Sequence, residues 1–250
     1  MIEQWITPPW DAPPNVRAMI TTRQVGVSEA PYAGLNLGDH VGDVAEHVAQ
    51  NRAILRQRLP AEPKWLTQVH GHAVADADLL RDKVEADAAV ARSEGTVCAV
   101  LTADCLPLLL CDSGGTVVAA AHAGWRGLAA GVIERTVESM GVAPSSLMVY
   151  LGPAIGPSAF EVGDEVWQTF VAADPAAARA FARIQQPAFG PPKWLADIYL
   201  LARQRLNRLG VEHIYGGEYC TVHDAVRFYS YRRDGVTGRM ASLIWLERRS

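Results

Sequence analysis

The side chains best suited to chemistry are one cysteine and two histidines, each at the end or at a break of a predicted strand. His70 ends the stretch 65–69, Cys105 interrupts the run TADCLPLLLCD, and His122 precedes a glycine turn. Imidazole and thiolate are zinc ligands, and three protein ligands with one open position are typical of catalytic zinc. No tight motif is present, so each residue also has a structural alternative: a turn residue, a buried thiol and a core histidine.

Asp104 lies beside Cys105 at the same break, and Pro107 follows. Burying a carboxyl group without a partner costs free energy of folding, which indicates that Asp104 has a function at this break. Two roles are open. Asp104 moves a proton during catalysis, or it accepts the free imidazole N–H of His70 or His122 and so orients that ligand. Pro107 has no N–H, which predicts that strand pairing stops here.

The segment HAGWRG predicts an anion site, because an apolar strand runs through a glycine turn into a helix at LAAGVIERTVESM. Amide groups in the first turn of a helix favour negative charge in front of them. Arg126 can add a guanidinium group that matches phosphate oxygens. Other candidates for phosphate or substrate contact, with surface ion pairs as the alternative for the arginines, are Arg23, Asn36, Arg232 and Arg233.

Hydrophobic patterning predicts one α+β domain over residues 1–250, without a linker or a repeat of fixed period. Helices are expected at 43–59 and 194–210 and from about Glu165, and two C-terminal strands are expected around an Asp-Gly turn within 227–246. Continuous apolar runs, typical of strands in sheets covered on both faces, lie at 88–91, 97–101, 108–111 and 117–121.

Composition narrows the class of protein. The 250 residues are 49% hydrophobic, and 23 basic against 27 acidic residues give a net charge of −4 without a charged block. Nucleic acid and anionic membranes are therefore not expected partners. The N-terminal segment lacks the pattern of a signal peptide and no stretch has the length of a membrane span, so a cytoplasmic location is expected. Of the cysteines, Cys98 and Cys111 lie within apolar runs and are expected in the core, reduced.

Six segments together resemble one bacterial family: TQVHG, TADCLPLLLCD, HAGWRGLAAGV, GPAIG, FEVGDEV and FYSYRRDGVTGR. It is the family once labelled multicopper polyphenol oxidase or laccase-domain protein, later assigned purine nucleoside phosphorylase and adenosine deaminase activity and also described as a peptidoglycan editing factor. The resemblance runs from about Arg23 to the C-terminus. One departure is Val25, where the family pattern has the first glycine of a pair.

This resemblance implies a mixed α/β sandwich in which His70, Cys105 and His122 hold zinc, with copper sometimes given instead. It also implies phosphorolysis of inosine, adenosine or methylthioadenosine with inorganic phosphate, and deamination of adenosine. Cys105 and Asp104 are then the catalytic candidates, and Arg126, Arg23, Asn36 and Arg233 the candidates for phosphate or substrate. Trp125, Tyr229 and Tyr231 are aromatic side chains that could stack on a purine, with core packing as the alternative.

Three other functions remain alternatives. A hydrolase or amidase acting in peptidoglycan precursor editing would use Cys105 as nucleophile and His122 as base. A copper-dependent polyphenol oxidase is disfavoured, because the seven histidines are scattered and no methionine adjoins the motifs. A metal-binding accessory protein without enzyme activity is the third. The preferred nucleoside, the native metal, the physiological role and the oligomeric state stay open.

Overall fold

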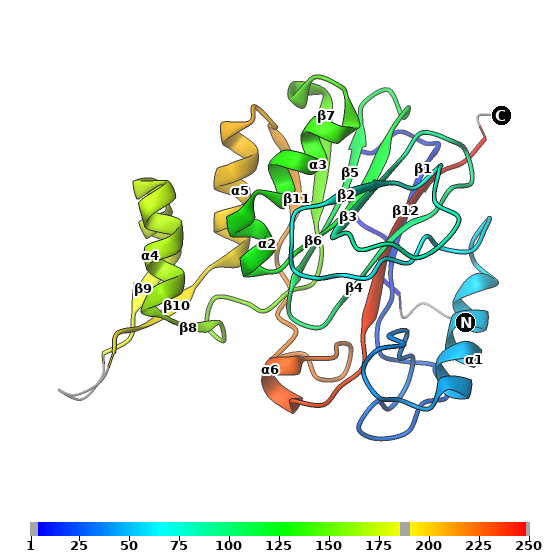
Figure 1. Ribbon diagram of the computed structural model, residues 1–250, viewed down its shortest axis with the longest axis horizontal. Coiled ribbons are helices and arrows are strands. Elements are labelled where there is room, and N and C mark those ends of the chain that lie inside the picture. The colour runs from blue at the N-terminus through cyan, green and yellow to red at the C-terminus, as the bar shows by residue number, and fades with distance from the viewer. Residues whose placement is uncertain (1–4, 186–190, 249–250) are drawn as a thin grey trace.

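The computed structural model describes residues 5–185 and 191–248, and its centre is a mixed sheet of six strands (Figure 1). In spatial order the sheet contains β11 (His213–Gly216), β7 (Leu147–Leu151), β5 (Leu106–Asp112), β6 (Val118–Ala123), β3 (Ala88–Ala91) and β2 (Val74–Asp76). The four inner strands pair with one another antiparallel. Each outer strand is parallel to its inner neighbour, β11 to β7 and β2 to β3.

A second, antiparallel sheet of three strands packs on one face of the first. Its order is β1 (Val16–Ile20), β12 (Met240–Leu246) and β4 (Cys98–Thr102). Side chains alternate along β5, so that Leu109 and Cys111 join the cluster between the sheets, whereas Leu106, Leu108 and Leu110 join the cluster on the opposite face.

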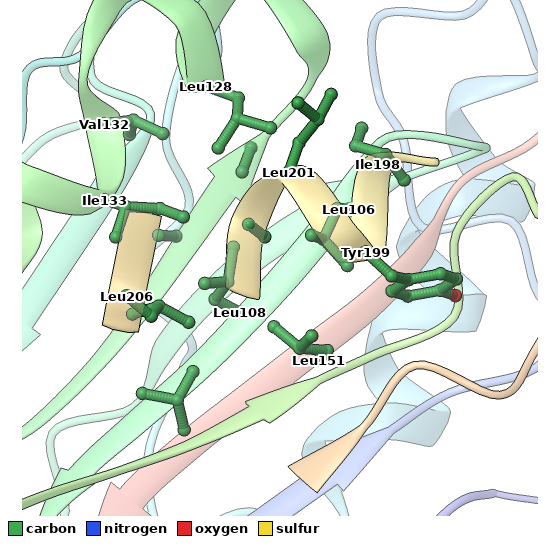
Figure 2. Close-up of a cluster of buried hydrophobic side chains, with 14 of the residues drawn as sticks. Leu106, Leu108, Leu128, Val132, Ile133, Leu151, Ile198, Tyr199, Leu201 and Leu206 are labelled. Carbon is green, nitrogen blue, oxygen red and sulfur yellow. The ribbon is translucent and has the colours of Figure 1, made fainter. Parts of the chain in front are cut away.

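Helices cover the remaining faces, as Figure 1 shows. On the six-stranded sheet lie α2 (Trp125–Ala130), α3 (Val132–Met140) and α5 (Ile198–Arg208), and Figure 2 shows their side chains meeting those of the strands. Helix α1 (Ala45–Arg56) contributes Leu55 to a cluster on the outer face of β4 and β12. The central strands are thus buried on both faces, which confirms the interpretation of the continuous apolar runs.

A smaller layer extends beyond α5 (Figure 1). It joins α4 (Asp164–Ala173) to a three-stranded sheet of β8 (Glu161–Gly163), β10 (Lys193–Ala196) and β9 (Phe181–Arg183), with a 3₁₀ helix at Pro175–Ala180. A further 3₁₀ turn lies at Pro144–Ser146, and the four-residue helix α6 (Tyr231–Asp234) precedes β12. Within the described residues, no helix combines the length and the apolar character needed to cross a bilayer.

Three local predictions are wrong. The segment 65–69 forms one isolated bridge, at Thr67, rather than a strand. The C-terminal hairpin is absent, because the turn region forms α6 and β12 pairs with the distant strands β1 and β4. Pro107 does not stop pairing: it lies inside β5 opposite His122, and its carbonyl group accepts a hydrogen bond from the Gly152 N–H at 2.9 Å.

Candidate metal centre

Three chain segments meet at one end of the six-stranded sheet. Strands β5 and β6 are antiparallel, so the start of β5 and the end of β6 lie at the same edge. Cys105 directly precedes β5, and His122 is the penultimate residue of β6. His70 comes from a turn with a positive φ of +59°. The predicted strand ends are therefore brought together, although His70 arrives on a turn.

The donor atoms of His70, Cys105 and His122 all lie within 4.8 Å of one another. Cys105 Sγ is 3.8 Å from His70 Nε2, and the two imidazole rings have centroids 4.8 Å apart. In tetrahedral zinc sites the sulfur and nitrogen ligands lie about 3.6 Å apart, from bond lengths of about 2.3 and 2.05 Å. The donor set therefore fits a metal ion after small side-chain adjustments.

Asp87, which the sequence reasoning missed, holds two of the ligands in place. Its fully buried carboxylate bonds His122 Nδ1 at 2.8 Å, which leaves Nε2 to face the centre. The same carboxylate accepts the backbone N–H groups of Val69, His70 and Gly71 at 2.6 to 3.2 Å. Burial acts to raise the pKa of Asp87, but His122 and these N–H groups outweigh it and lower the pKa. One ionised carboxylate thus shapes the His70 turn and fixes the His122 ring.

The thiol of Cys105 is activated by its neighbours. Burial acts to raise its pKa, but the adjacent imidazoles of His122 and His70 outweigh burial and lower the pKa of Cys105. Burial likewise opposes the charged form of His122, and Cys105 and Asp87 together raise its pKa. The pair therefore favours thiolate beside imidazolium when no metal is bound, and the thiolate is the form that binds metal.

Two glycines in HAGWRG let the chain pass close to the ligands. A Cβ atom at Gly124 would lie 2.8 Å from Cys105 Sγ and 3.0 Å from His70 Cδ2. At Gly127 it would lie 2.7 Å from the carbonyl oxygen of Gly71. These glycines therefore serve close packing against the metal centre. The expected helix is broken at Gly131, and its first part, α2, has only six residues.

Asp104 adopts a positive φ of +91° in the crossover from β4 to β5, and its carboxylate is buried. It accepts hydrogen bonds from Thr221 Oγ1 at 2.5 Å, Ser230 Oγ at 3.0 Å and the Arg232 N–H at 2.6 Å. The residue that orients His122 is therefore Asp87, which corrects the orienting role considered for Asp104. Asp104 instead joins the Cys105 crossover to the start of α6.

A pocket of about 470 Å³ opens over the three ligands. This volume is in the range of small-molecule sites. Polar and charged lining residues include Gln68, Asp104, Arg126, Arg232 and Arg239, together with His40 and Tyr231. Apolar lining is supplied by Leu101, Trp125, Ile155, Phe160 and Ile198.

Only some of the residues predicted to bind phosphate or substrate line this pocket. Arg126 does, and so does Arg232. The other three serve the protein's own backbone and turns. Arg23 lies over the Tyr229 ring. Asn36 is buried, and its side-chain amide donates hydrogen bonds to Asp43 and to the Gly38 carbonyl group. Arg233 donates to backbone carbonyl groups of residues 221, 222 and 228. Their predicted contact with ligand is not supported by this arrangement.

The lining residues that sequence reasoning missed include His40, Gln68 and Arg239. Gln68 lies two positions before His70, and its side chain bonds the backbone of Leu101 in both directions, at 2.8 and 2.7 Å. His40 lies two residues after Gly38, in the chain between β1 and α1. Arg239 lies in TGR, inside one of the six motifs, where a positively charged residue before a buried strand was the available signal.

Together these features define a mixed α/β protein that presents a His, Cys and His donor set, able to hold a metal ion, to a small-molecule pocket. The chain belongs to the family described as multi-copper polyphenol oxidoreductase laccase, whose model matches residues 17–247.

Relatives and solved structures agree with this membership. A purine nucleoside phosphorylase of Pseudomonas aeruginosa is 55% identical over 243 residues, covering 97% of this chain and 98% of the relative. Purine nucleoside phosphorylase YfiH of Escherichia coli is 53% identical over 249 residues, covering 96% and 98%. A Neisseria meningitidis crystal structure superposes with a TM-score of 0.92 at 51% identity, covering 98% of this chain and all of that one. These matches confirm the predicted fold class.

Proposed function

We propose that this protein is a zinc-dependent purine nucleoside phosphorylase that accepts inosine, adenosine and methylthioadenosine and also deaminates adenosine. The observation that carries the proposal is the position of the His70, Cys105 and His122 donor set in the wall of an arginine-lined pocket. The names of relatives such as those of P. aeruginosa and E. coli support the phosphorylase activity.

The donor set favours zinc over copper. Two imidazoles and one thiolate with an open fourth position suit a catalytic zinc, which would supply Lewis acidity when bound. A blue-copper centre usually adds a weak axial methionine, and no methionine lines the pocket within the described residues. A multicopper oxidase needs several donor clusters, whereas the described residues contain one.

Arg126 is the residue we assign to phosphate. Its guanidinium group lies 4.5 Å from the Trp125 ring centroid and faces the pocket without a carboxylate partner in the described part of the chain. Arg232 and Arg239 add charge to the same wall, although each also bonds backbone carbonyl groups. Because α2 is short, we attribute anion binding to these guanidinium groups more than to the helix terminus.

The experiment is cleavage of inosine by the zinc-loaded protein with and without phosphate, with product identification. Ribose 1-phosphate should form only with phosphate. Charge-assisted hydrogen bonds contribute about 1.5 to 3 kcal/mol, so Arg126→Ala should lower kcat/KM about ten- to a hundredfold. Arg126→Lys should restore part of it, because lysine keeps the charge but loses the planar fork. Arg135→Ala, which removes an exposed ion pair with Glu138 on α3, is the matched control.

One arrangement favours a second function, a hydrolase or amidase acting on peptidoglycan precursors. In this arrangement the nucleophile would be Cys105, the base His122, and the acid that orients the base Asp87. The His122 to Asp87 contact is 2.8 Å long. Free ribose formed at an equal rate without phosphate would favour hydrolysis. Activity that persists after complete zinc removal would favour the cysteine nucleophile, and bound metal without turnover of any substrate would favour the accessory protein.

A further inference from the structure

We propose that His40 delivers the proton that the purine needs as it leaves. The inference rests on the proposed phosphorylase activity and adds a catalytic residue to it. His40 is not among the site residues predicted from the sequence, but it lines the same pocket as the candidate metal ligands.

The chemistry requires such a group. A phosphate oxygen forms a bond to C1′ of the ribose while the bond from C1′ to N9 breaks, and its electron pair stays on the purine. A proton transferred from the His40 imidazolium to N7 neutralises the departing base, and His40 regains a proton from water. General acids of this kind contribute roughly a hundred- to ten-thousandfold in rate.

The pocket offers few alternative donors. His70, Cys105 and His122 form the metal donor set. Asp104 uses both carboxylate oxygens to accept hydrogen bonds from Thr221, Ser230 and Arg232. The lining arginines remain charged and do not release protons near neutral pH. His40 and Tyr231 remain, and a phenol is a far weaker acid than an imidazolium.

The surroundings of His40 suit proton exchange. Its Nδ1 lies 3.4 Å from Asp39 Oδ1, and the side chain is 54% exposed, so water can reach it. Asp39 is held by Lys83 at 3.1 Å and by Arg52 at 3.3 Å. Two cationic groups, on separate segments, thus fix the Asp39 carboxylate beside the His40 ring.

Charges around the ring have opposing effects. Burial lowers the pKa of His40, the bond to Asp39 raises it, and Arg239 and Lys83 lower it, so the net direction is below the usual value. A phosphate dianion bound in the pocket adds negative charge and favours the imidazolium. Phosphorolysis should therefore weaken as the pH rises through the His40 pKa, because the protonated form is lost.

The test compares inosine with 7-methylinosine, whose base is already cationic and leaves without a proton. His40→Ala and His40→Gln should lower kcat/KM for inosine about a hundredfold and should change it for 7-methylinosine several-fold at most. Both variants should lose the decline of inosine cleavage with rising pH. His213→Ala, at the exposed edge strand β11, is the control and should match the wild type.

The outcomes separate the two proposals. If the wild type cleaves no nucleoside with phosphate, the phosphorylase proposal fails. If the wild type cleaves inosine but the His40 variants lose both substrates equally, or keep the wild-type pH profile, His40 is not the acid. A selective loss of inosine in Tyr231→Phe would transfer the role to Tyr231. Zinc content and melting temperature, measured for every variant, exclude loss of the metal or of the fold as the cause.

Discussion

Asp87 is the residue on which the geometry of the metal centre most depends. It supports both the ring of His122 and the turn that carries His70. Asp87→Asn keeps the size of the side chain but removes its charge, and an amide N–H₂ then faces backbone donors. Loss of a partner of this kind typically weakens metal binding about 10- to 100-fold. We expect that loss of zinc affinity, measured by competition with a chromogenic chelator.

The matched control is Asp112→Asn. Asp112 is also a buried acid, and it accepts the N–H groups of Thr116 and Val117 in a turn that does not line the pocket. This variant should lose stability and keep its zinc affinity. Equal zinc affinity in wild type and Asp87→Asn would contradict the role assigned to Asp87.

Cys105 offers a pH-dependent readout of the same centre. In the metal-free protein the lowered pKa of Cys105 means that its thiolate forms at a lower pH than that of a free cysteine, whose pKa is about 8.5. Alkylation by iodoacetamide should therefore reach half its maximal rate below pH 7 and decline as the pH falls further. Rates at site 105 are measured by peptide mass spectrometry, with Cys105→Ser identifying the signal and zinc suppressing it. A half-point near pH 8.5 would show that the histidines do not activate the thiol.

The candidate donor set could be found from sequence, whereas its support could not. His70, Cys105 and His122 stand at ends or breaks of predicted strands, and the family resemblance assigned them to metal. Asp87 stands one residue before the strand Ala88–Ala91, among several acids, and only the antiparallel pairing of β3 with β6 places it opposite His122. This pairing is a tertiary contact, so the local sequence around Asp87 does not reveal it.

At the scale of the element, the loop after β1 has a strained residue. Val25 has a φ of +70°, and a Cβ at the next residue, Gly26, would collide with the carbonyl oxygen of Gly34. The glycine pair of the family pattern would fit this conformation without strain, so the loop keeps its shape despite the departure.

We therefore expect Val25→Gly to raise stability slightly. The left-handed conformation costs a non-glycine residue about 1–2 kcal/mol, which glycine avoids. Glycine is also more flexible in the unfolded chain, which lowers the free energy of unfolding by about 0.5–1 kcal/mol. The net gain should be about 0 to 1.5 kcal/mol, measured by urea unfolding. Val27→Gly, at a nearby exposed valine without positive φ, should instead destabilise. A loss of stability in both variants would argue against strain at Val25.

The failed hairpin prediction has a physical reason at this same scale. An Asp-Gly pair between apolar stretches favours a two-residue turn. Here Ser230 Oγ accepts the Arg233 N–H and starts a helical turn, while Asp104 accepts the Arg232 N–H. The long-range contact to Asp104 outweighs the local preference, and β12 finds its partners in β1 and β4.

In the whole molecule, two sheets share one core, and two cysteines belong to it. Cys98 of β4 and Cys111 of β5 both lie in the cluster between the sheets, and burial raises the pKa of each thiol. Cys98→Ala and Cys111→Ala should each lower the free energy of unfolding by about 1–2 kcal/mol through lost packing. Zinc content and kcat per folded molecule should stay at the wild-type level. A collapse of activity with folding intact would mean that a core cysteine takes part in the chemistry.

The position of β12 has a consequence for synthesis. This strand lies between β1 and β4, so the middle of the three-stranded sheet is made after both of its edges. Until residues 240–246 have been synthesised, the edges of β1 and β4 that pair with β12 have no partner. Unpaired strand edges of this kind can pair with other chains. The three-stranded sheet is therefore completed late in synthesis, and a ribosome that stalls shortly before β12 leaves a chain that is prone to aggregate.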